Sequence, residues 1–295
     1  MTEPRLEEVA DRVFAYVQPD GGWCLNNAGI AGGLVIDTAA TEARARALRE
    51  SAEEIARTRL VVNTHHHGDH THGNFVFARD APVIAHPLAR TEMSRRGLAL
   101  CEVWPDRAWG ALKVALPTLT VADRLTVHAG SIRAEVLHPG PAHTTGDLVV
   151  WLPDHRVVFT GDLVLPGCAP FTLMGSVAGT LEAVARLREL DPLVVVGGHG
   201  PVAGPGALDE TEAYLRRVQR LAAEGRAAGL TPLETALEAG HGEFDGLRDA
   251  ERLVANLHRA YADADGVEPG TGLRSGPVFR EMTAFNGGRH PVCRV

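Results

Sequence analysis

Lysine, cysteine and long apolar runs are all scarce in this sequence of 295 residues. Lys113 is the single lysine, and 29 basic residues face 37 acidic ones, which gives a formal net charge of −8. Because nucleic-acid binding is driven by clustered Lys and Arg, this balance argues against a nucleic-acid partner. The 4 cysteines lack the spacing of a metal site or a disulfide scaffold, which favours free thiols in a reducing compartment.

No apolar segment stands near the N-terminus. Residues 1–16 carry 4 acidic residues and no run of apolar ones. A signal peptide or a membrane-spanning helix needs such a run. We therefore expect a cytoplasmic enzyme with no membrane partner, while its oligomeric state, including a homo-oligomer, stays open.

Histidine, by contrast, is crowded into one short segment. Directly after an apolar run, residues 64–74 read Thr-His-His-His-Gly-Asp-His-Thr-His-Gly-Asn. Buried imidazoles this close together cannot all find hydrogen-bond partners, and a bound cation removes that problem. His65 and His67 lie two apart and can face one ion, while Asp69 and His70, beyond the glycine, can reach a second. The alternative is a solvated histidine-rich loop.

Three later fragments each place a His or an Asp at the end of an apolar run, and they contain His143, Asp162 and His199. Together with the histidine segment they complete, in order, the pattern His-x-His-x-Asp-His followed by a lone His, an Asp and a final His. In this pattern the chain resembles the metallo-β-lactamase superfamily, whose members use these positions as metal ligands. Chance agreement at all of them is improbable.

The resemblance implies a centre with two Zn²⁺ ions. It gives His65, His67 and His143 to one ion, Asp69, His70 and His199 to the other, and Asp162 to both. Imidazole nitrogen and carboxylate oxygen suit Zn²⁺ at about 2.0–2.2 Å. Such a centre would provide a metal-bound hydroxide as the nucleophile, with Asp69 as proton acceptor. An iron-using thiol dioxygenase shares the first motif and stays open as an alternative.

Asp37 ends a short apolar stretch and has two interpretations. By the resemblance, it is an aspartate that orients a ligand histidine from behind. It could equally cap the helix expected to start near Thr41. The sequence alone does not distinguish the two.

The pattern of apolar runs predicts an α/β fold. Strands are predicted at residues 13–17, 27–30, 34–37, 60–63, 82–85, 119–127, 132–138, 148–152, 157–160 and 193–196. Helices are predicted at residues 41–57, 180–190, 208–228, 232–239 and 247–261, with a loose linker at 263–276. The resemblance implies that these form an αββα metallo-β-lactamase sandwich over residues 1–207, with a helical C-terminal extension over residues 208–295 packed on it.

A substrate pocket is predicted from aromatic and apolar residues in segments that are too apolar for exposed loops. Its predicted lining is Trp23, Trp104, Trp109, Phe171, Leu173 and Met174. For the last three, packing beneath the helix expected from Thr180 is the alternative.

Four stretches, at residues 21–29, 171–181, 194–204 and 249–260, are similar to the metallo-β-lactamase-fold cyclases of aromatic type II polyketide pathways. That family implies ring closure by aldol condensation, release from an acyl carrier protein by thioester hydrolysis, or both. The partner would then be an acyl-carrier-protein-bound or free aromatic polyketide intermediate. Two alternatives stay open: a glyoxalase-II-like or other small thioester or ester hydrolase, and a non-catalytic binding protein.

Overall fold

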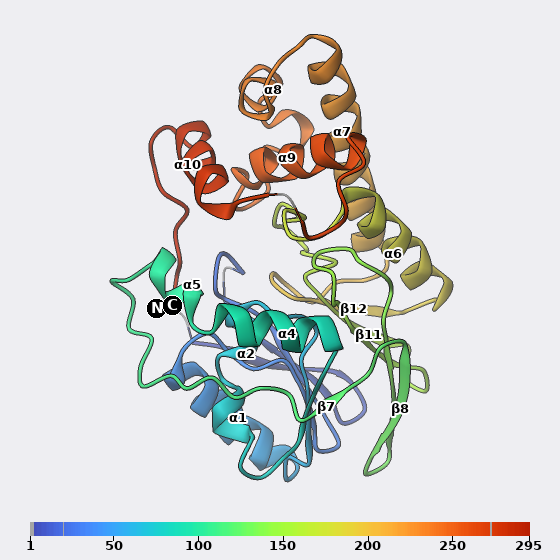
Figure 1. Cartoon of the computed structure of the whole chain (residues 1–295). Coiled ribbons are helices and arrows are strands. Elements are labelled where there is room, and N and C mark those ends of the chain that lie inside the picture. The colour runs from blue at the N-terminus through green and yellow to red at the C-terminus, as the bar shows by residue number, and fades with distance from the viewer. Residues whose placement is uncertain (1–2, 20, 272) are drawn as a thin grey trace.

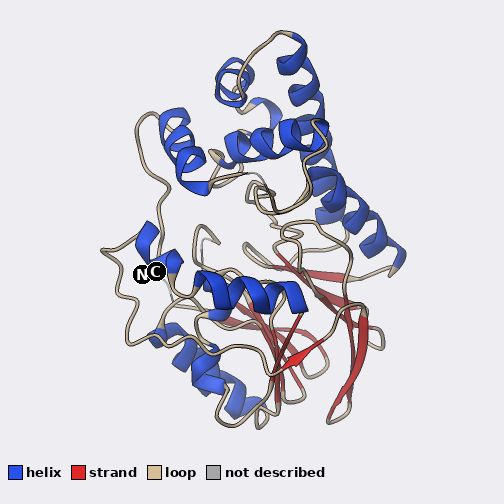
Figure 2. Cartoon of the chain, viewed as in Figure 1, coloured by secondary structure: helices blue, strands red, loops and turns tan. Residues whose placement is uncertain are grey.

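The structure is a computed structural model that describes residues 3–19, 21–271 and 273–295. Two β-sheets pack face to face, helices cover their outer faces, and further helices stand over one end of the sandwich (Figures 1 and 2). The predicted α/β sandwich with C-terminal helices is thus confirmed. None of the helices in the described ranges is long and apolar enough to cross a membrane.

The strands form one sheet of 7 and one of 5. The first sheet contains β1 (Arg5–Ala10), β2 (Val13–Val17), β3 (Ala28–Ala31), β4 (Leu34–Ile36), β5 (Leu60–Val62), β6 (Val83–Ala85) and β7 (Leu119–Thr120), in that order. The second, in the order β12-β11-β10-β9-β8, contains β8 (Arg124–Ala129), β9 (Ile132–Leu137), β10 (Val149–Leu152), β11 (Val157–Gly161) and β12 (Val194–Gly197). Strands β4 to β7 run parallel, as do β11 and β12.

The helices divide into those on the sandwich and those beyond it. The first group is α1 (Glu42–Ile55), α2 (Gly68–Thr71), α3 (Asn74–Phe77), α4 (Pro87–Arg96), α5 (Ala99–Val103) and α6 (Val177–Glu189). The second is α7 (Gly206–Ala227), α8 (Pro232–Ala239), the 3-10 turn η1 (Gly242–Phe244), α9 (Arg252–Ala264) and α10 (Ser275–Phe285). In Figure 1 this second group stands above the sheets.

The core between the sheets follows the two-residue alternation of the strands. In β9, Ile132, Ala134 and Val136 are buried, and the residues between them are half-buried. They pack with inward-facing residues of both sheets, including Leu34 and Phe159. The outer faces are buried too, by α1 on the first sheet and by α6 on the second. Burial on both faces explains why the central strands are continuous apolar runs.

The loops that leave the strands meet at one edge of the sandwich. The backbone N–H of Leu148 donates to the carbonyl of Thr64 at 2.6 Å, and that of Gly198 donates to Gly161 at 2.7 Å. Asn27 in turn donates to the carbonyl of Gly198 at 2.7 Å. The bonds of Leu148 and Asn27 join the two sheets, and that of Gly198 links the ends of β11 and β12, at the edge where His65, Asp162 and His199 gather.

The C-terminal helices share a core with a loop of the sandwich. Leu215 of α7 and Leu257 of α9 are buried in one cluster with Phe171 from the loop after β11. The predicted boundary at residues 207 and 208 falls in the first turn of α7, where Ala207 and Leu208 pack on the second sheet. The division into two units stays a prediction.

Two predicted elements are wrong in detail. The strand predicted over 119–127 is two strands in different sheets, because β7 pairs with β6 and β8 pairs with β9. The helix predicted from residue 247 begins at Arg252, because the backbone of Arg248 bonds to Gly167 and Ala169 instead. Extended pairing with a neighbouring loop has replaced the first helical turn.

Strand β1 and five helices, α2, α3, α4, α5 and α10, were not predicted. The two longest of these helices, α4 and α10, begin with residues typical of loops. Helix α4 has Pro87 in its first turn and is capped by His86, whose Nδ1 accepts from the N–H of Leu88 at 3.2 Å. Helix α10 carries Gly276 and Pro277 in its first turn, where a proline is tolerated because that N–H has no helical partner. The predicted linker is therefore shorter at its C-terminal end than expected.

Candidate metal centre

The residues that could hold a metal form two neighbouring clusters. One contains His65, His67, His143 and Asp162, and the other contains Asp69, His70 and His199. In each cluster the ligand atoms lie within 4.8 Å of one another. The clusters contain the same seven residues that the sequence pattern singles out.

The turn from strand to helix places the first four ligands. The chain bends at residues 64–66 after β5 ends at Val62, and it becomes helical at Gly68, directly after His67, whose φ and ψ are −63° and 146°. His65 and His67 both face the first cluster. Asp69 and His70 follow in the first turn of α2 and face the second cluster.

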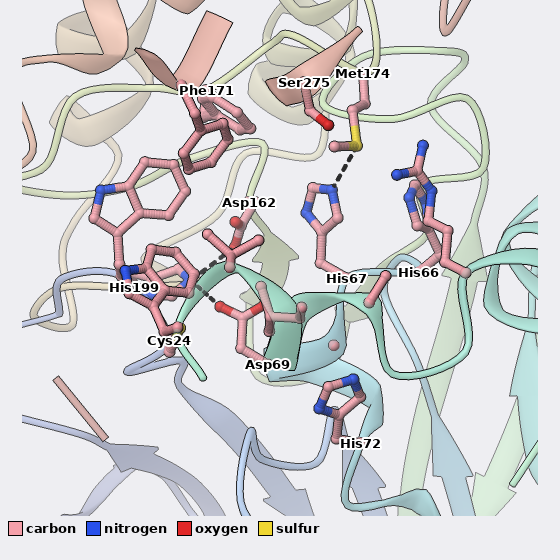
Figure 3. Close-up of a pocket in the computed structure, with 18 of the residues that line it drawn as sticks. Cys24, His66, His67, Asp69, His72, Asp162, Phe171, Met174, His199 and Ser275 are labelled. Carbon is pink, nitrogen blue, oxygen red and sulfur yellow. Dashed lines mark hydrogen bonds and ion pairs between the residues drawn. The ribbon is translucent and has the colours of Figure 1, made fainter. Parts of the chain in front are cut away.

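In the first cluster three imidazole nitrogens point at a common centre. Nδ1 of His67 lies 3.1 Å from Nε2 of His65 and 2.9 Å from Nε2 of His143. In the second cluster Nε2 of His199 lies 3.4 Å from Nε2 of His70 and 3.3 Å from Oδ2 of Asp69. Figure 3 shows Asp69 and Asp162 directed toward His199.

Asp162 presents one carboxylate oxygen to each cluster. Its Oδ1 lies 3.1 Å from Nε2 of His70 and 3.5 Å from Nε2 of His199. Its Oδ2 lies 3.5 Å from Nε2 of His143 and 4.0 Å from Nε2 of His65. This is the arrangement of a bridging carboxylate.

The spacing of these atoms fits divalent metal ions. Two ligand atoms at about 2.0–2.1 Å from a tetrahedral ion lie roughly 3.3 Å apart, close to most of the separations in both clusters. Oδ1 of Asp162 is buried, and no hydrogen-bond donor among the described residues satisfies it, so a coordinated metal ion would fit there. Burial also holds the pKa of His65 and of His67 well below its usual value, so both imidazoles are in the neutral form that binds metals.

Asp37 lies directly behind the second cluster. Its Oδ2 accepts from Nδ1 of His70 at 2.8 Å and from the hydroxyl of Thr64 at 2.7 Å. Its Oδ1 accepts from the backbone N–H of Thr64 at 2.7 Å. The N-cap of α1 is Thr41, whose side chain accepts from Arg44. Asp37 therefore holds the imidazole of His70, a candidate metal ligand, and does not cap the helix.

The other ligand histidines are held in the same manner. Nδ1 of His65 contacts the hydroxyl of Thr64 at 3.0 Å. Nδ1 of His143 bonds to the carbonyl of Phe171 at 2.5 Å, and Nδ1 of His199 bonds to the carbonyl of Gly22 at 3.2 Å. Nε2 of His67 lies 3.2 Å from the sulfur of Met174. Each imidazole is thus oriented through the nitrogen that faces away from the cluster.

Gly198 has no side chain, and this allows its backbone to lie directly against the carboxylate of Asp162. A Cβ on Gly198 would lie 1.9 Å from Oδ1 of Asp162, a distance that real Cβ atoms do not show. Any side chain at Gly198 would displace the carboxylate that faces both clusters.

The carboxylates and imidazoles of the two clusters strongly shift one another's pKa values. Burial alone would lower the pKa of His70, but the carboxylates of Asp162, Asp37 and Asp69 outweigh it and raise that pKa well above its usual value. Burial would raise the pKa of Asp162, but His199, His70 and His143 hold it well below its usual value. The centre therefore keeps its carboxylates ionised, ready to bind a cation.

A pocket of about 910 Å³, part of it open to solvent, lies over the clusters. One side of it, the aromatic wall, consists of Trp23, Trp104, Phe171 and Phe279. The Trp23 ring centre lies 5.2 Å from that of Phe171, 5.9 Å from Trp104 and 5.7 Å from Phe279. Met174 also lines the pocket, beside His67 (Figure 3).

Trp109 and Leu173, predicted to line the pocket, lie behind it. Trp109 is buried and donates from Nε1 to the carbonyl of Trp104 at 3.0 Å, so it supports the wall from outside. Leu173 is buried among the C-terminal helices, as the alternative interpretation of that segment has it. Leu173 and Met174 are the central residues of a turn closed by the hydrogen bond from the N–H of Gly175 to the carbonyl of Thr172 at 2.9 Å, and of the two only Met174 lines the pocket.

Several lining residues were not predicted, among them Arg252, Phe279 and His66. Arg252 is buried, with its guanidinium 4.1 Å from the centre of the Trp23 ring and 2.9 Å from the carboxylate of Asp249. An Asp and an Arg three apart at the start of a largely apolar helix could have drawn attention to it. Phe279 lies on the helix that was not predicted, and His66 was passed over because its neighbours are ligands.

Comparison with known proteins agrees with this geometry. The family model described as "Metallo-beta-lactamase superfamily" matches residues 21–199. Over 207 residues the chain is 27% identical to the 2,4-dinitroanisole O-demethylase subunit alpha of Nocardioides sp. (strain JS1661), covering 67% of this chain and 57% of that protein. Over 157 residues it is 27% identical to the human acyl-coenzyme A thioesterase MBLAC2, covering 47% of this chain and 55% of that protein. The chain thus spans little more than half the length of these relatives.

Solved structures share the fold. A metallo-beta-lactamase from Pontibacter korlensis superposes with a TM-score of 0.61 at 20% identity, covering 72% of this chain and 99% of that one. Its likeness concerns the fold alone. The family match, which spans more than half of the sequence and includes all seven clustered residues, shows that the chain belongs to the metallo-β-lactamase superfamily.

Proposed function

We propose that this protein is a zinc-dependent cyclase and thioesterase that closes a ring of an aromatic polyketide intermediate, hydrolyses its acyl-carrier-protein thioester, or does both. The observation that carries the proposal is the aromatic wall, which stands directly over the two ligand clusters. Flat aromatic rings pack well against Trp and Phe rings at about 4.5–7 Å between ring centres. A partly cyclised poly-β-ketone offers both a flat ring and a reactive chain.

Two Zn²⁺ ions in the clusters would supply Lewis acidity and an activated water near neutral pH. The protein's own contribution is position and proton transfer. Asp69 lines the pocket, and its Oδ2 lies 3.3 Å from Nε2 of His199. Its carboxylate can therefore take a proton from a carbon atom of a substrate bound above it. The aromatic wall holds the ring and excludes water from the reacting face, which favours ring closure over early hydrolysis.

Hydrolysis of a small thioester is the second candidate function. A human relative is named as an acyl-coenzyme A thioesterase, and a relative from Synechococcus sp. (strain ATCC 27144 / PCC 6301 / SAUG 1402/1), 30% identical over 162 residues, is named as a hydroxyacylglutathione hydrolase. A site for glutathione or coenzyme A esters would need cationic groups for their carboxylates or phosphates. The pocket offers Arg96 and Arg252, but most of its wall is apolar.

The test compares ring closure with hydrolysis in one assay. We would load the protein with zinc, measure bound zinc, and supply a carrier-bound, partly cyclised aromatic octaketide thioester. Mass spectrometry would follow cyclised product and free acid for the wild type, Asp162→Ala and the control Asp154→Ala, whose exposed side chain lies in a hairpin turn far along the sheet. Zinc-dependent cyclised product that is lost only in Asp162→Ala supports the proposal. A small glutathione or coenzyme A thioester would be supplied in parallel, and its turnover with neither cyclised product nor free acid from the octaketide would refute the proposal in favour of the second candidate.

A further inference from the structure

The pocket has a polar side that the proposed reaction does not use. In Figure 3, Phe171 lies to one side of His67 and His66 lies to the other. Arg96, at the end of α4, lines the pocket together with His66, and its neighbour Gly97 borders a second, smaller cavity with His66. A ligand ring against the aromatic wall would therefore turn one edge toward His66 and Arg96.

This side carries an excess of positive charge. The carboxylate of Glu92 accepts from Arg96 Nε at 2.7 Å and also from Arg95, at 3.0 Å from Nε and 2.6 Å from a terminal nitrogen. One carboxylate thus faces two guanidinium groups. Arg95 is 61% exposed and points to solvent, whereas Arg96 is 33% exposed and lines the pocket.

His66 supplies an independent sign that a ligand binds here. It is 6% exposed, and neither of its ring nitrogens has a hydrogen-bond partner among the described residues. A buried imidazole without partners is unfavourable, because it has given up its hydrogen bonds to water and gained none. A ligand oxygen that reaches this side of the pocket would restore them.

We propose that His66 and Arg96 form a subsite for an acidic oxygen of a flat ligand, a phenolate or the enolate of a β-diketone. The choice of ligand rests on the proposed function, because such oxygens are the substituents of aromatic polyketide rings. The guanidinium of Arg96 binds the charged oxygen, the imidazole of His66 completes its hydrogen bonds, and the aromatic wall holds the ring. The subsite fixes which edge of the ring faces the metal ligands.

Binding can be tested without turnover. We would measure quenching of tryptophan fluorescence by 2-hydroxyanthraquinone at a pH where it is ionised, and by unsubstituted anthraquinone. The hydroxyl of this probe is not adjacent to a carbonyl, so it cannot chelate zinc. The zinc-loaded wild type should prefer the hydroxylated probe by about tenfold, the size of one charge-assisted hydrogen bond.

In Arg96→Gln the preference should fall to twofold or less. Arg95→Gln, on the same helix and with the same carboxylate partner, should keep it. His66→Asn should retain most of the preference, and His66→Leu should lose part of it, with zinc content measured for both. An unchanged preference in Arg96→Gln, an equal loss in Arg95→Gln, or an unchanged preference in His66→Leu with normal zinc content would overturn the proposal.

The two proposals can fail separately. If the octaketide is not cyclised but the preference depends on Arg96, the subsite stands and the proposed reaction does not. If cyclisation is observed and Arg96→Gln keeps the preference, the reaction stands and the subsite does not. A third probe, anthraquinone-2-carboxylate, carries a carboxylate in place of the phenol. If it binds better than the phenol, the subsite prefers carboxylates, and the proposed class of ligand is wrong.

Discussion

Replacing Asp37 by Asn should weaken the binding of a metal ion to the second cluster and leave the binding of an ion to the first cluster unchanged. Asp37 has a φ of 60°, a conformation that Asn tolerates, so the backbone should not change. The amide keeps one acceptor oxygen, which can retain the bond from the backbone of Thr64. The NH₂ group then faces His70 and the Thr64 hydroxyl, where the carboxylate accepted two hydrogen bonds.

The substitution weakens metal binding by changing the tautomer of His70. With a donor opposite Nδ1, the imidazole is more stable with its proton on Nε2, the nitrogen that faces His199 and Asp162. A proton on Nε2 blocks metal binding. Loss of such an orienting partner typically weakens a metal by about 10–100-fold, or about 1.4–2.7 kcal/mol.

The assay is a zinc titration against a competing chelator, which resolves two binding constants. The control is Thr41→Ala, which removes the N-cap of α1 and should lower stability by about 1 kcal/mol without changing either constant. Equal weakening of both ions by Asp37→Asn, or a pure loss of stability like that of the control, would refute the assigned role of Asp37.

Three further predictions follow from the same contacts. Gly198→Ala should displace the Asp162 carboxylate and abolish metal-dependent activity, whereas Gly204→Ala, which meets nothing within 4 Å, should be neutral in the same zinc and activity assays. Chelation of the metal should lower the melting temperature, because the clustered carboxylates lose their counter-charges; an unchanged melting curve would count against a metal centre. Glu92 has its pKa lowered to about 2 by Arg95 and Arg96, so its stabilising effect is present above pH 4.5 and is lost as pH falls toward 2. Urea unfolding of metal-free Glu92→Gln should therefore differ from wild type by less than about 1 kcal/mol at pH 7, and the difference should vanish near pH 2.

The sequence predicts well which residues cluster, because their chemistry is carried by side-chain type and spacing. His65 and His67 follow a buried strand two residues apart, and both lie in the first cluster. The partners of His143 and His199 are invisible at this level, because they are the backbone carbonyls of Phe171 and Gly22, and any residue has a carbonyl. Only the folded chain shows that these carbonyls face the imidazoles.

The pocket was harder to predict because its walls come from distant segments. Trp23 and Trp104 could be named from their surroundings, but Phe279 required a helix that begins with Gly and Pro. Trp109 and Leu173 were placed wrongly because aromatic or apolar character does not tell which side of a loop faces a cavity. Tertiary packing decides that question.

The aromatic wall has a consequence for how proteins of this type can diversify. All seven clustered ligands lie between residues 65 and 199, whereas the outer part of the wall depends on Phe279 and on Arg252 beneath Trp23. Part of the pocket that selects the ligand is therefore encoded outside the stretch that carries the seven clustered residues. Exchange of the C-terminal helices would change which molecules the pocket binds and leave the seven clustered residues unchanged. Because the four rings of the aromatic wall contact one another, the effects of substituting them on ligand binding should be strongly non-additive.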